Sequence, residues 1–233
     1  MKRQGLAASL VAVISLSAVF AFASAGGGAG VSADEALSRL LAGNKRYVES
    51  KMNACEETTA AAREKLAKGQ QPYAIILSCS DSRVPPEIIF DKSLGEIFVV
   101  RVAGNVPDPV VLGSIEYAAE HLGSPLVMVL GHERCGAVKA TVDANGKAEG
   151  NIGAIVKAIA PALKKAKMDK KCDLKDKENL VECVVDANAQ MVAQNLTKQS
   201  RIIRELVHEG KLKIVAAKYD LDDGKVTVFD AKK

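Results

Sequence analysis

The chain has 233 residues, of which 48% are hydrophobic and 26% are charged. This balance excludes a disordered chain, and the length suits one compact domain of the α/β size range. The formal net charge of +4 is not gathered into a basic block beside aromatic residues, and the chain has no tryptophan, so the composition argues against a nucleic-acid partner.

The start of the chain has the pattern of an export signal. Two basic residues are followed by a run of small apolar residues over 6–22, and Ala23-Ser24-Ala25 matches an A-x-A cleavage site. We predict that residues 1–25 are a signal peptide cleaved near Ala25, because the apolar run is short for the alternative, an uncleaved anchor. The mature protein is then periplasmic or secreted, with no membrane partner after cleavage.

A glycine-rich spacer is expected over residues 26–31, and a single domain over residues 32–233. Ser32 and Glu35 resemble a capping box that opens the first helix of this domain. A second helical stretch is predicted from about residue 56 to residue 68. Together the two helices form an N-terminal helical arm.

Three apolar runs in the middle of the chain predict the centre of the fold. They cover residues 74–77, 97–102 and 126–130, and they are rich in Val, Ile and Leu without polar alternation. Such runs are typical of parallel strands that are covered on both faces. Residues 110–121 have helical periodicity. The pattern predicts an α/β fold with a mostly parallel sheet flanked by helices.

The last third of the chain is predicted to be mainly helical. Residues 150–167 carry apolar side chains at helical spacing, and residues 180–208 form one long helix or two. A strand follows over residues 212–217, and Asp222-Asp223-Gly224 signals a hairpin turn into a last strand over residues 226–229.

Five cysteines, at positions 55, 79, 135, 172 and 183, cannot all form disulfides because their number is odd. Cys172 and Cys183 flank a charged segment and are candidates to pair in an oxidising compartment. Cys55 is expected to be a free thiol. Cys79 and Cys135 have different neighbours, which indicate another role.

Metal-binding residue types follow two of the predicted strands. Cys79 comes directly after the first strand, and His132 follows the third, with Cys135 three residues later. The carboxyl ends of strands in an open α/β sheet are where ligands bind. Two thiolates and an imidazole suit zinc, and three protein ligands leave a fourth position open. A structural zinc site usually has four ligands, so this pattern favours a catalytic metal.

Each of these residues also has an ordinary alternative role. A lone cysteine at a strand end is usually a small buried apolar residue, and a lone histidine there is usually a hydrogen-bonded polar group. The joint placement favours a metal site over both alternatives. His121 and His208 lack such support, and each is predicted to end a helix near a glycine as a structural residue.

A carboxylate and a guanidinium lie close to the first candidate ligand. If Cys79 binds zinc, Asp81 is near enough to become a fourth ligand or to accept a hydrogen bond from a metal-bound water. Arg83 can hold this carboxylate with two hydrogen bonds and turn it away from the metal. The alternative is an ordinary surface ion pair, which is common and weak.

Three segments, CSDSRVP, FVVRVAGN and LGHERCGAV, closely resemble the β-class carbonic anhydrases, and the resemblance extends over nearly the whole mature chain. It implies one zinc ion per chain, held by Cys79, His132 and Cys135. It also implies that Asp81 and Arg83 are a catalytic dyad, and that zinc-bound hydroxide hydrates CO₂ reversibly to bicarbonate and a proton. Members of this class form dimers or higher oligomers, so a homodimer or homotetramer is expected, with the N-terminal helices wrapping a partner.

The resemblance also implies a substrate pocket of the plant-type subgroup. Gln70, Phe98 and Tyr117 match residues that line an apolar CO₂ pocket, where the glutamine amide orients an oxygen of the substrate. This subgroup keeps water as the fourth zinc ligand, whereas the other subgroup can close the metal with the aspartate. Val102 and Ala103 depart from the usual residues after the arginine, which implies a reshaped pocket wall.

Two rival functions use the same residues. The site is equally suited by its ligands to carbonyl sulfide or carbon disulfide as the substrate. A non-catalytic zinc-binding module is the other alternative, but the intact pair of Asp81 and Arg83 argues against it. A thiol redox role has less support, because the chain has no C-x-x-C motif.

Overall fold

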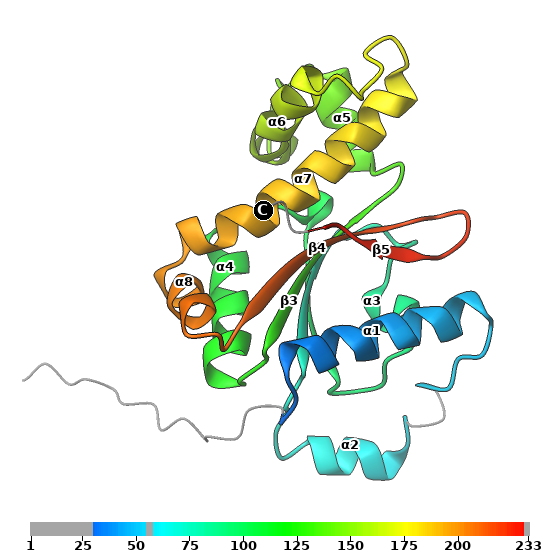
Figure 1. Ribbon diagram of the computed structural model, residues 1–233, viewed down its shortest axis with the longest axis vertical. Helices are drawn as coiled ribbons and strands as arrows, with labels where there is room; N and C mark the ends of the chain where they lie inside the picture. Colours follow the sequence, from blue (N-terminus) through cyan, green and yellow to red (C-terminus); the bar gives the residue numbers. More distant parts are fainter. Residues whose placement is uncertain (1–29, 55–57, 231–233) are drawn as a thin grey trace, which may run out of the picture.

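The computed structural model describes residues 30–54 and 58–230, so the predicted signal peptide, most of the predicted spacer and Cys55 lie outside the described residues. Its centre is a sheet built from β1 (Ala74–Ser78), β2 (Ile97–Arg101), β3 (Leu126–His132), β4 (Lys213–Tyr219) and β5 (Val226–Val228). The strand order is β2-β1-β3-β4-β5, and Figure 1 labels β3, β4 and β5 in this sheet. Only the β4–β5 pair is antiparallel. The predicted α/β fold with a mostly parallel sheet is therefore confirmed.

The central strands β1 and β3 are buried along their whole length. Successive side chains on a strand point to opposite faces of the sheet. Ile75 and Leu77 accordingly enter one apolar core, whereas Ile76 enters the other. Both faces are apolar because both are covered, which explains the absence of polar alternation in these two strands.

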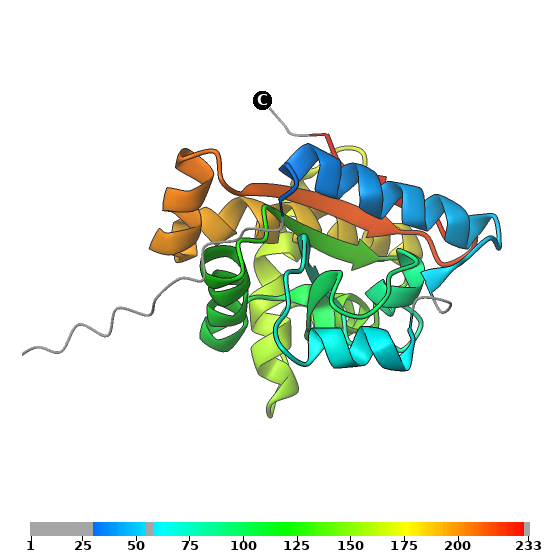
Figure 2. The same cartoon turned by 90° about the horizontal axis from the view of Figure 1, so that it is seen from below.

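Helices supply the rest of both cores. The core that contains Ile75 includes residues of α4, η3, α7 and α8, and the core that contains Ile76 includes residues of α1, α3, α5, α6 and α7. Figure 2 shows α1 (blue) and α4 (green) on opposite sides of the sheet. No helix within the described ranges is long and apolar enough to cross a membrane. The helices are α1 (Ala33–Val48), α2 (Ala60–Leu66), α3 (Pro86–Ile89), η2 (Ala103–Asn105), α4 (Pro109–Glu116), η3 (Tyr117–His121), α5 (Gly136–Asp143), α6 (Ile152–Met168), α7 (Lys177–Gln199) and α8 (Arg201–His208).

The two N-terminal helices differ in how they pack. The hydroxyl of Ser32 accepts a hydrogen bond from the backbone N–H of Glu35 at 3.1 Å, which caps α1 as expected. Ala36 and Leu40 of α1 are fully buried against the chain's own core. Helix α2 starts only at Ala60, is shorter than the predicted stretch of residues 56–68, and has no buried residue. Of the two helices that were predicted to form an arm, α1 therefore packs into the core of its own domain.

Two predicted helices have boundaries that the apolar pattern did not show. The helix over residues 110–121 ends as a π-helical turn, η3, whose apolar spacing resembles that of an α-helix. The stretch 180–208 is two helices, α7 and α8, because the hydroxyl of Ser200 caps a new helix by accepting from the N–H of Ile203 at 3.0 Å.

The predicted hairpin joins β4 to β5, but it has a longer loop than a tight Asp-Gly turn. Tyr219 pairs with Val226, so residues 220–225 form the loop. The Asp220 carboxylate accepts a hydrogen bond from the N–H of Asp222 at 2.7 Å. Gly224, at φ +76°, provides the left-handed residue that returns the chain to β5.

Cys172 and Cys183, which the sequence left as candidates to pair, are joined in the structure. The two residues form a disulfide with a Cα–Cα distance of 6.1 Å, within the usual range for such bonds. The bond ties the segment after α6 to the N-terminal part of α7.

Candidate metal centre

The fold brings together the three predicted metal ligands. Cys79 follows β1, His132 ends β3, and Cys135 caps the start of α5. Their ligand atoms all lie within 4.8 Å of one another, and the residues are 5%, 1% and 1% exposed. The site therefore lies at the carboxyl edge of the sheet and is shielded from solvent.

The imidazole of His132 is arranged as a metal ligand would be. Its Nδ1 lies 2.8 Å from the backbone oxygen of Glu133, to which it donates a hydrogen bond. The lone pair is consequently on Nε2, which is buried and has no hydrogen-bond partner. Such an unpaired buried atom costs about 1–3 kcal/mol. An imidazole whose Nδ1 is fixed by a backbone oxygen, and whose Nε2 lies near two thiols, fits a zinc ion.

The two cysteines share a proton unequally. The hydrogen bond from the Cys135 thiol lowers the pKa of Cys79 to about 4, with further help from the N–H of Gly104, against the effect of burial. The Gly104 nitrogen lies 3.3 Å from the Cys79 sulfur. The same hydrogen bond to Cys79, reinforced by burial, raises the pKa of Cys135. A metal ion bound here would take the place of the proton on the Cys135 thiol.

Asp81 is held by Arg83 through both oxygens. The Arg83 Nε and Nη2 atoms donate to the two carboxylate oxygens at 3.0 and 2.8 Å, and the Arg83 backbone N–H adds a third bond at 3.0 Å. These hydrogen bonds hold the pKa of Asp81 well below its usual range. The Asp81 Oδ2 atom is also 3.9 Å from His132 Nε2. The carboxylate thus borders the metal site while Arg83 restrains it.

Arg101 is a further residue of the site, which the sequence motifs alone did not indicate. It ends β2, and its guanidinium donates to the backbone oxygens of Cys79 at 2.9 Å and Asp81 at 2.6 Å. It therefore fixes the turn that carries the first ligand and the carboxylate. Its position at the end of the second predicted strand, in the segment FVVRVAGN, was the available signal.

The three predicted pocket residues gather elsewhere in the same chain. The rings of Phe98 and Tyr117 have centroids 6.4 Å apart, and Tyr117 and Gln70 line one cavity of about 820 Å³. None of the three metal ligands lines this cavity. Phe98 pairs with Ile75, four residues before Cys79, which corresponds to about 13 Å along the strand. In one chain, these three residues are not beside the metal site.

Figure 1 shows the same separation at the scale of the fold. Helix α2, which precedes Gln70, lies at one end of the molecule, and α5, which follows Cys135, lies near the other. The two other histidines are also apart from the centre. His121 ends η3 with its ring 5.4 Å from that of Tyr117, and His208 ends α8. Neither belongs to a group of possible metal ligands among the described residues.

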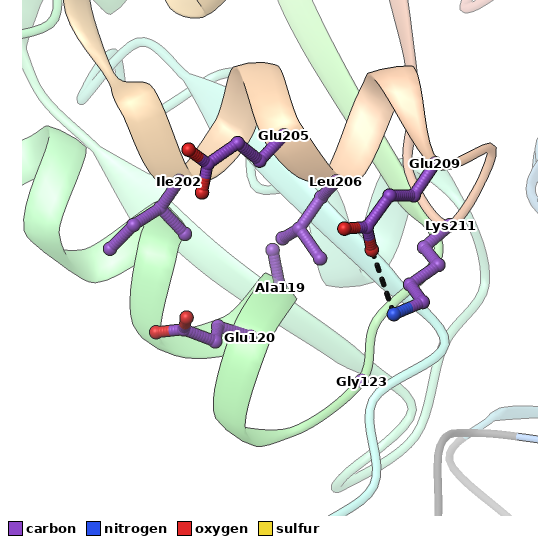
Figure 3. Close-up of a pocket in the computed structure, with 8 residues that line it drawn as sticks. All are labelled: Ala119, Glu120, Gly123, Ile202, Glu205, Leu206, Glu209 and Lys211. Atoms are coloured by element: carbon purple, nitrogen blue, oxygen red, sulfur yellow. Dashed lines mark ion pairs between the residues drawn. The ribbon is translucent and has the colours of Figure 1, made fainter.

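A second cavity, shown in Figure 3, lies between η3 and α8 and has a volume of about 560 Å³. Glu120, Glu205 and Glu209 line it, and Lys211 pairs with Glu209 at 2.8 Å. A groove with this excess of carboxylates repels small anions. It is therefore a poor place for an anionic product.

Comparisons with known proteins agree with this geometry. The sequence profile of the carbonic anhydrase family matches residues 74–226. Carbonic anhydrase 2 of Mycobacterium tuberculosis is 39% identical over 196 residues, which cover 82% of this chain and 90% of the relative. The carbonic anhydrase of Mycolicibacterium smegmatis is 41% identical over 167 residues, which cover 70% of this chain and 78% of the relative.

Solved structures show the same fold. The β-carbonic anhydrase CafA of Aspergillus fumigatus superposes with a TM-score of 0.67 at 25% identity, over 84% of this chain and 92% of that one. The β-carbonic anhydrase CcaA gives a TM-score of 0.67 at 26% identity, over 83% and 95%. The matched region includes both strand ends that carry Cys79 and His132. The chain therefore belongs to the carbonic anhydrase family, in its β class, and is an enzyme of CO₂ hydration.

Proposed function

We propose that this enzyme hydrates CO₂ reversibly to bicarbonate and a proton with one zinc ion per chain, held by Cys79, His132 and Cys135. The observation that carries the proposal is the buried Nε2 of His132, which has no hydrogen-bond partner and faces two thiols. A bound zinc ion supplies a Lewis acid that lowers the pKa of its water to about 7. The remaining catalytic roles belong to the chain's own residues.

Asp81 orients the attacking water. Its carboxylate stays ionised because three hydrogen bonds from Arg83 stabilise the charge. An ionised carboxylate accepts the water's hydrogen bond and directs a lone pair of the water toward CO₂. Arg83 donates to both carboxylate oxygens and so competes with a metal for them, which supports the open, plant-type form of the site.

Gln70, Phe98 and Tyr117 line the CO₂ pocket of a second copy of the chain. The three residues lie away from the metal ligands of the same chain. We therefore place them beside the metal ligands of another copy, where they would meet the substrate. The location of Phe98 on β2, at the edge of the sheet, and the 48% exposure of Tyr117 make both accessible to a partner. The active enzyme is then a homodimer or homotetramer.

The protein is exported and works in the periplasm or outside the cell. The leader pattern of residues 1–25 supports this placement. The disulfide between Cys172 and Cys183 supports it independently, since such bonds persist in oxidising compartments.

Stopped-flow measurement of CO₂ hydration on the protein from Gly26 onward tests the proposal, with the zinc content determined on the same sample. We expect one zinc per chain and rapid turnover from about pH 6.5 to 9, as an open metal site requires. Turnover restricted to alkaline pH would indicate that Asp81 closes the metal. Zinc without CO₂ turnover would contradict the proposal and favour carbonyl sulfide, carbon disulfide or a binding role.

A further inference from the structure

The turn between the second and third candidate ligands, residues 132–135 (the metal turn), contains a residue in an unusual backbone conformation. Arg134 has φ +49°, a region that non-glycine residues rarely adopt. Its backbone N–H donates to Oε1 of Glu182, a residue of α7, at 2.8 Å. One side chain from a distant helix therefore fixes the peptide that precedes Arg134, midway between His132 and Cys135.

Glu182 is itself held in place from behind. Its second oxygen accepts a hydrogen bond from Lys218 Nζ at 3.1 Å, and Lys218 also pairs with Asp186, one turn further along α7, at 3.1 Å. Lys218 lies on β4 directly beside Gly131 of β3. Because both carboxylate oxygens of Glu182 are engaged, its orientation toward the metal turn is defined by β3, β4 and α7 together.

The disulfide lies next to this contact in the sequence. Cys183 follows Glu182 on α7 and is bonded to Cys172, which precedes the helix. Glu182 and Cys183 lie in the second turn of α7, next to the end of the helix, and helices fray from their ends. A covalent tie at Cys183 restrains the part of α7 that presents Glu182.

We propose that Glu182 is a positioning residue for the metal turn, and that the Cys172–Cys183 disulfide fixes the helical segment from which it acts. The inference rests on the proposal that zinc binds at Cys79, His132 and Cys135. Glu182 touches neither metal nor substrate, so its loss leaves every ligand in place but lets the metal turn relax. Partners of this outer kind change metal affinity by about 10–100-fold.

Zinc release from the loaded enzyme into an excess of a chromophoric chelator tests the role of Glu182. We expect Glu182→Ala to release zinc about tenfold faster than the wild type. Glu182→Gln keeps an oxygen that accepts from the Arg134 N–H but loses the acceptor for Lys218, so it should release zinc at a rate between those of the wild type and Glu182→Ala. Glu178→Ala is the matched control, because Glu178 lies one turn earlier on α7 and lines the same cavity of about 450 Å³.

A second readout separates positioning from general destabilisation. In the cobalt-substituted enzyme, the thiolate-to-metal absorption band should shift in Glu182→Ala and stay unchanged in Glu178→Ala. The metal-free forms of both variants should have similar Tm values. If Glu182→Ala releases zinc no faster than Glu178→Ala, the proposed role of the N–H contact is wrong. It is also wrong if Glu182→Gln releases zinc as fast as Glu182→Ala.

A double-mutant cycle tests the disulfide. Replacing Cys172 and Cys183 by serine should accelerate zinc release when Glu182 is present and add nothing in the Glu182→Ala background. Equal acceleration in both backgrounds, or none in either, would overturn this part of the inference. The proposed function is judged separately, by zinc content and CO₂ turnover of the wild type. A zinc-loaded, active wild type with unaffected variants would leave that function standing and remove only this inference.

Discussion

The role of Asp81 depends on the side chain of its neighbour Arg83. A carboxylate beside an open metal position is a competent ligand, and nothing in the residue type prevents it from binding. Arg83 donates to both of its oxygens and thereby competes with the metal for the same lone pairs. The residue is left as an ionised acceptor at the border of the site, which is what orientation of a water requires.

At this scale we predict that Asp81→Asn retains zinc but hydrates CO₂ about a hundredfold more slowly, because an amide is a weaker acceptor and presents N–H groups to Arg83. Stopped-flow rates and zinc content on the same sample check this. His132→Ala is the contrasting variant, expected to lose zinc and activity together. Full activity in Asp81→Asn would remove that carboxylate from the mechanism.

At the scale of elements, one buried carboxylate joins α1 to the turn after α3. Asp91 accepts hydrogen bonds from Arg46 of α1 at 2.5 Å and from the backbone N–H groups of Asn53 and Ala54 at 3.0 and 2.8 Å. Burial by itself raises the pKa of Asp91, but these hydrogen bonds outweigh it and lower the pKa on balance. Asp91 therefore holds α1 against the domain as an anion.

We predict that Asp91→Asn lowers the free energy of unfolding by about 1–3 kcal/mol at neutral pH, because a buried amide cannot accept all the hydrogen bonds that Arg46, Asn53 and Ala54 donate to the carboxylate. A depressed native pKa contributes stability above the unfolded value, about 3.9, and this contribution is lost as the pH falls through the native pKa. Urea unfolding should show the difference from wild type shrinking below about pH 4. Asp34→Asn is the control, since Asp34 pairs with Lys213 in an exposed ion pair. An equal loss in both variants would contradict the prediction.

Gly104 connects the loop after β2 to the metal site. Its φ of +73° is one that L side chains rarely adopt, and an added Cβ would lie 2.7 Å from Cδ1 of Ile159. Its N–H donates to the Cys79 sulfur, and its oxygen accepts from Asn188 of α7 at 2.9 Å. Backbone conformation and packing both require glycine here, and the backbone of this glycine contacts a candidate metal ligand.

We predict that Gly104→Ala costs about 1–2 kcal/mol of stability and weakens zinc binding about tenfold through the disturbed N–H contact to sulfur. Urea unfolding of the metal-free protein and chelator competition measure the two effects. Gly113→Ala is the matched control, because an added Cβ on that helical glycine meets nothing within 4 Å, and it should stabilise α4 slightly. Undiminished zinc affinity in Gly104→Ala would show that the contact is dispensable.

Local patterns predicted the elements that are defined by local burial, and failed where distant contacts decide. The run over residues 74–77 matches β1 because both of its faces are apolar, and Cys79 with His132 could be placed together because parallel strands end at one edge. Arg101 and Glu182 were missed, because an arginine or glutamate gives no sign in the sequence of the backbone atom that it will meet far away. For a related reason the sequence left one helix or two open over residues 180–208, since a single hydroxyl cap at Ser200 separates α7 from α8.

At the scale of the whole molecule, the sheet separates the two halves of the proposed active site. The metal ligands lie at the carboxyl ends of β1 and β3, whereas Gln70 lies before β1 and shares a cavity with Tyr117. A parallel strand cannot bring its two ends together, so under the proposed function two chains form each intact site. In a two-fold symmetric dimer, each chain would then give its ligands to one site and its pocket residues to the other.

This arrangement predicts that two impaired variants rescue each other. His132→Ala lacks the metal but keeps the pocket, and Gln70→Ala keeps the metal but lacks the amide that orients CO₂. In a one-to-one mixture that is unfolded and refolded together, half of the dimers are mixed and one of their two sites is intact, so roughly a quarter of the wild-type activity should return. His132→Ala refolded with Cys79→Ser is the control, because every site then lacks a ligand, and it should stay inactive. If the first mixture gains no activity over its separately refolded components, the pocket and the metal belong to the same chain, and Gln70 reaches its substrate by a movement within one chain.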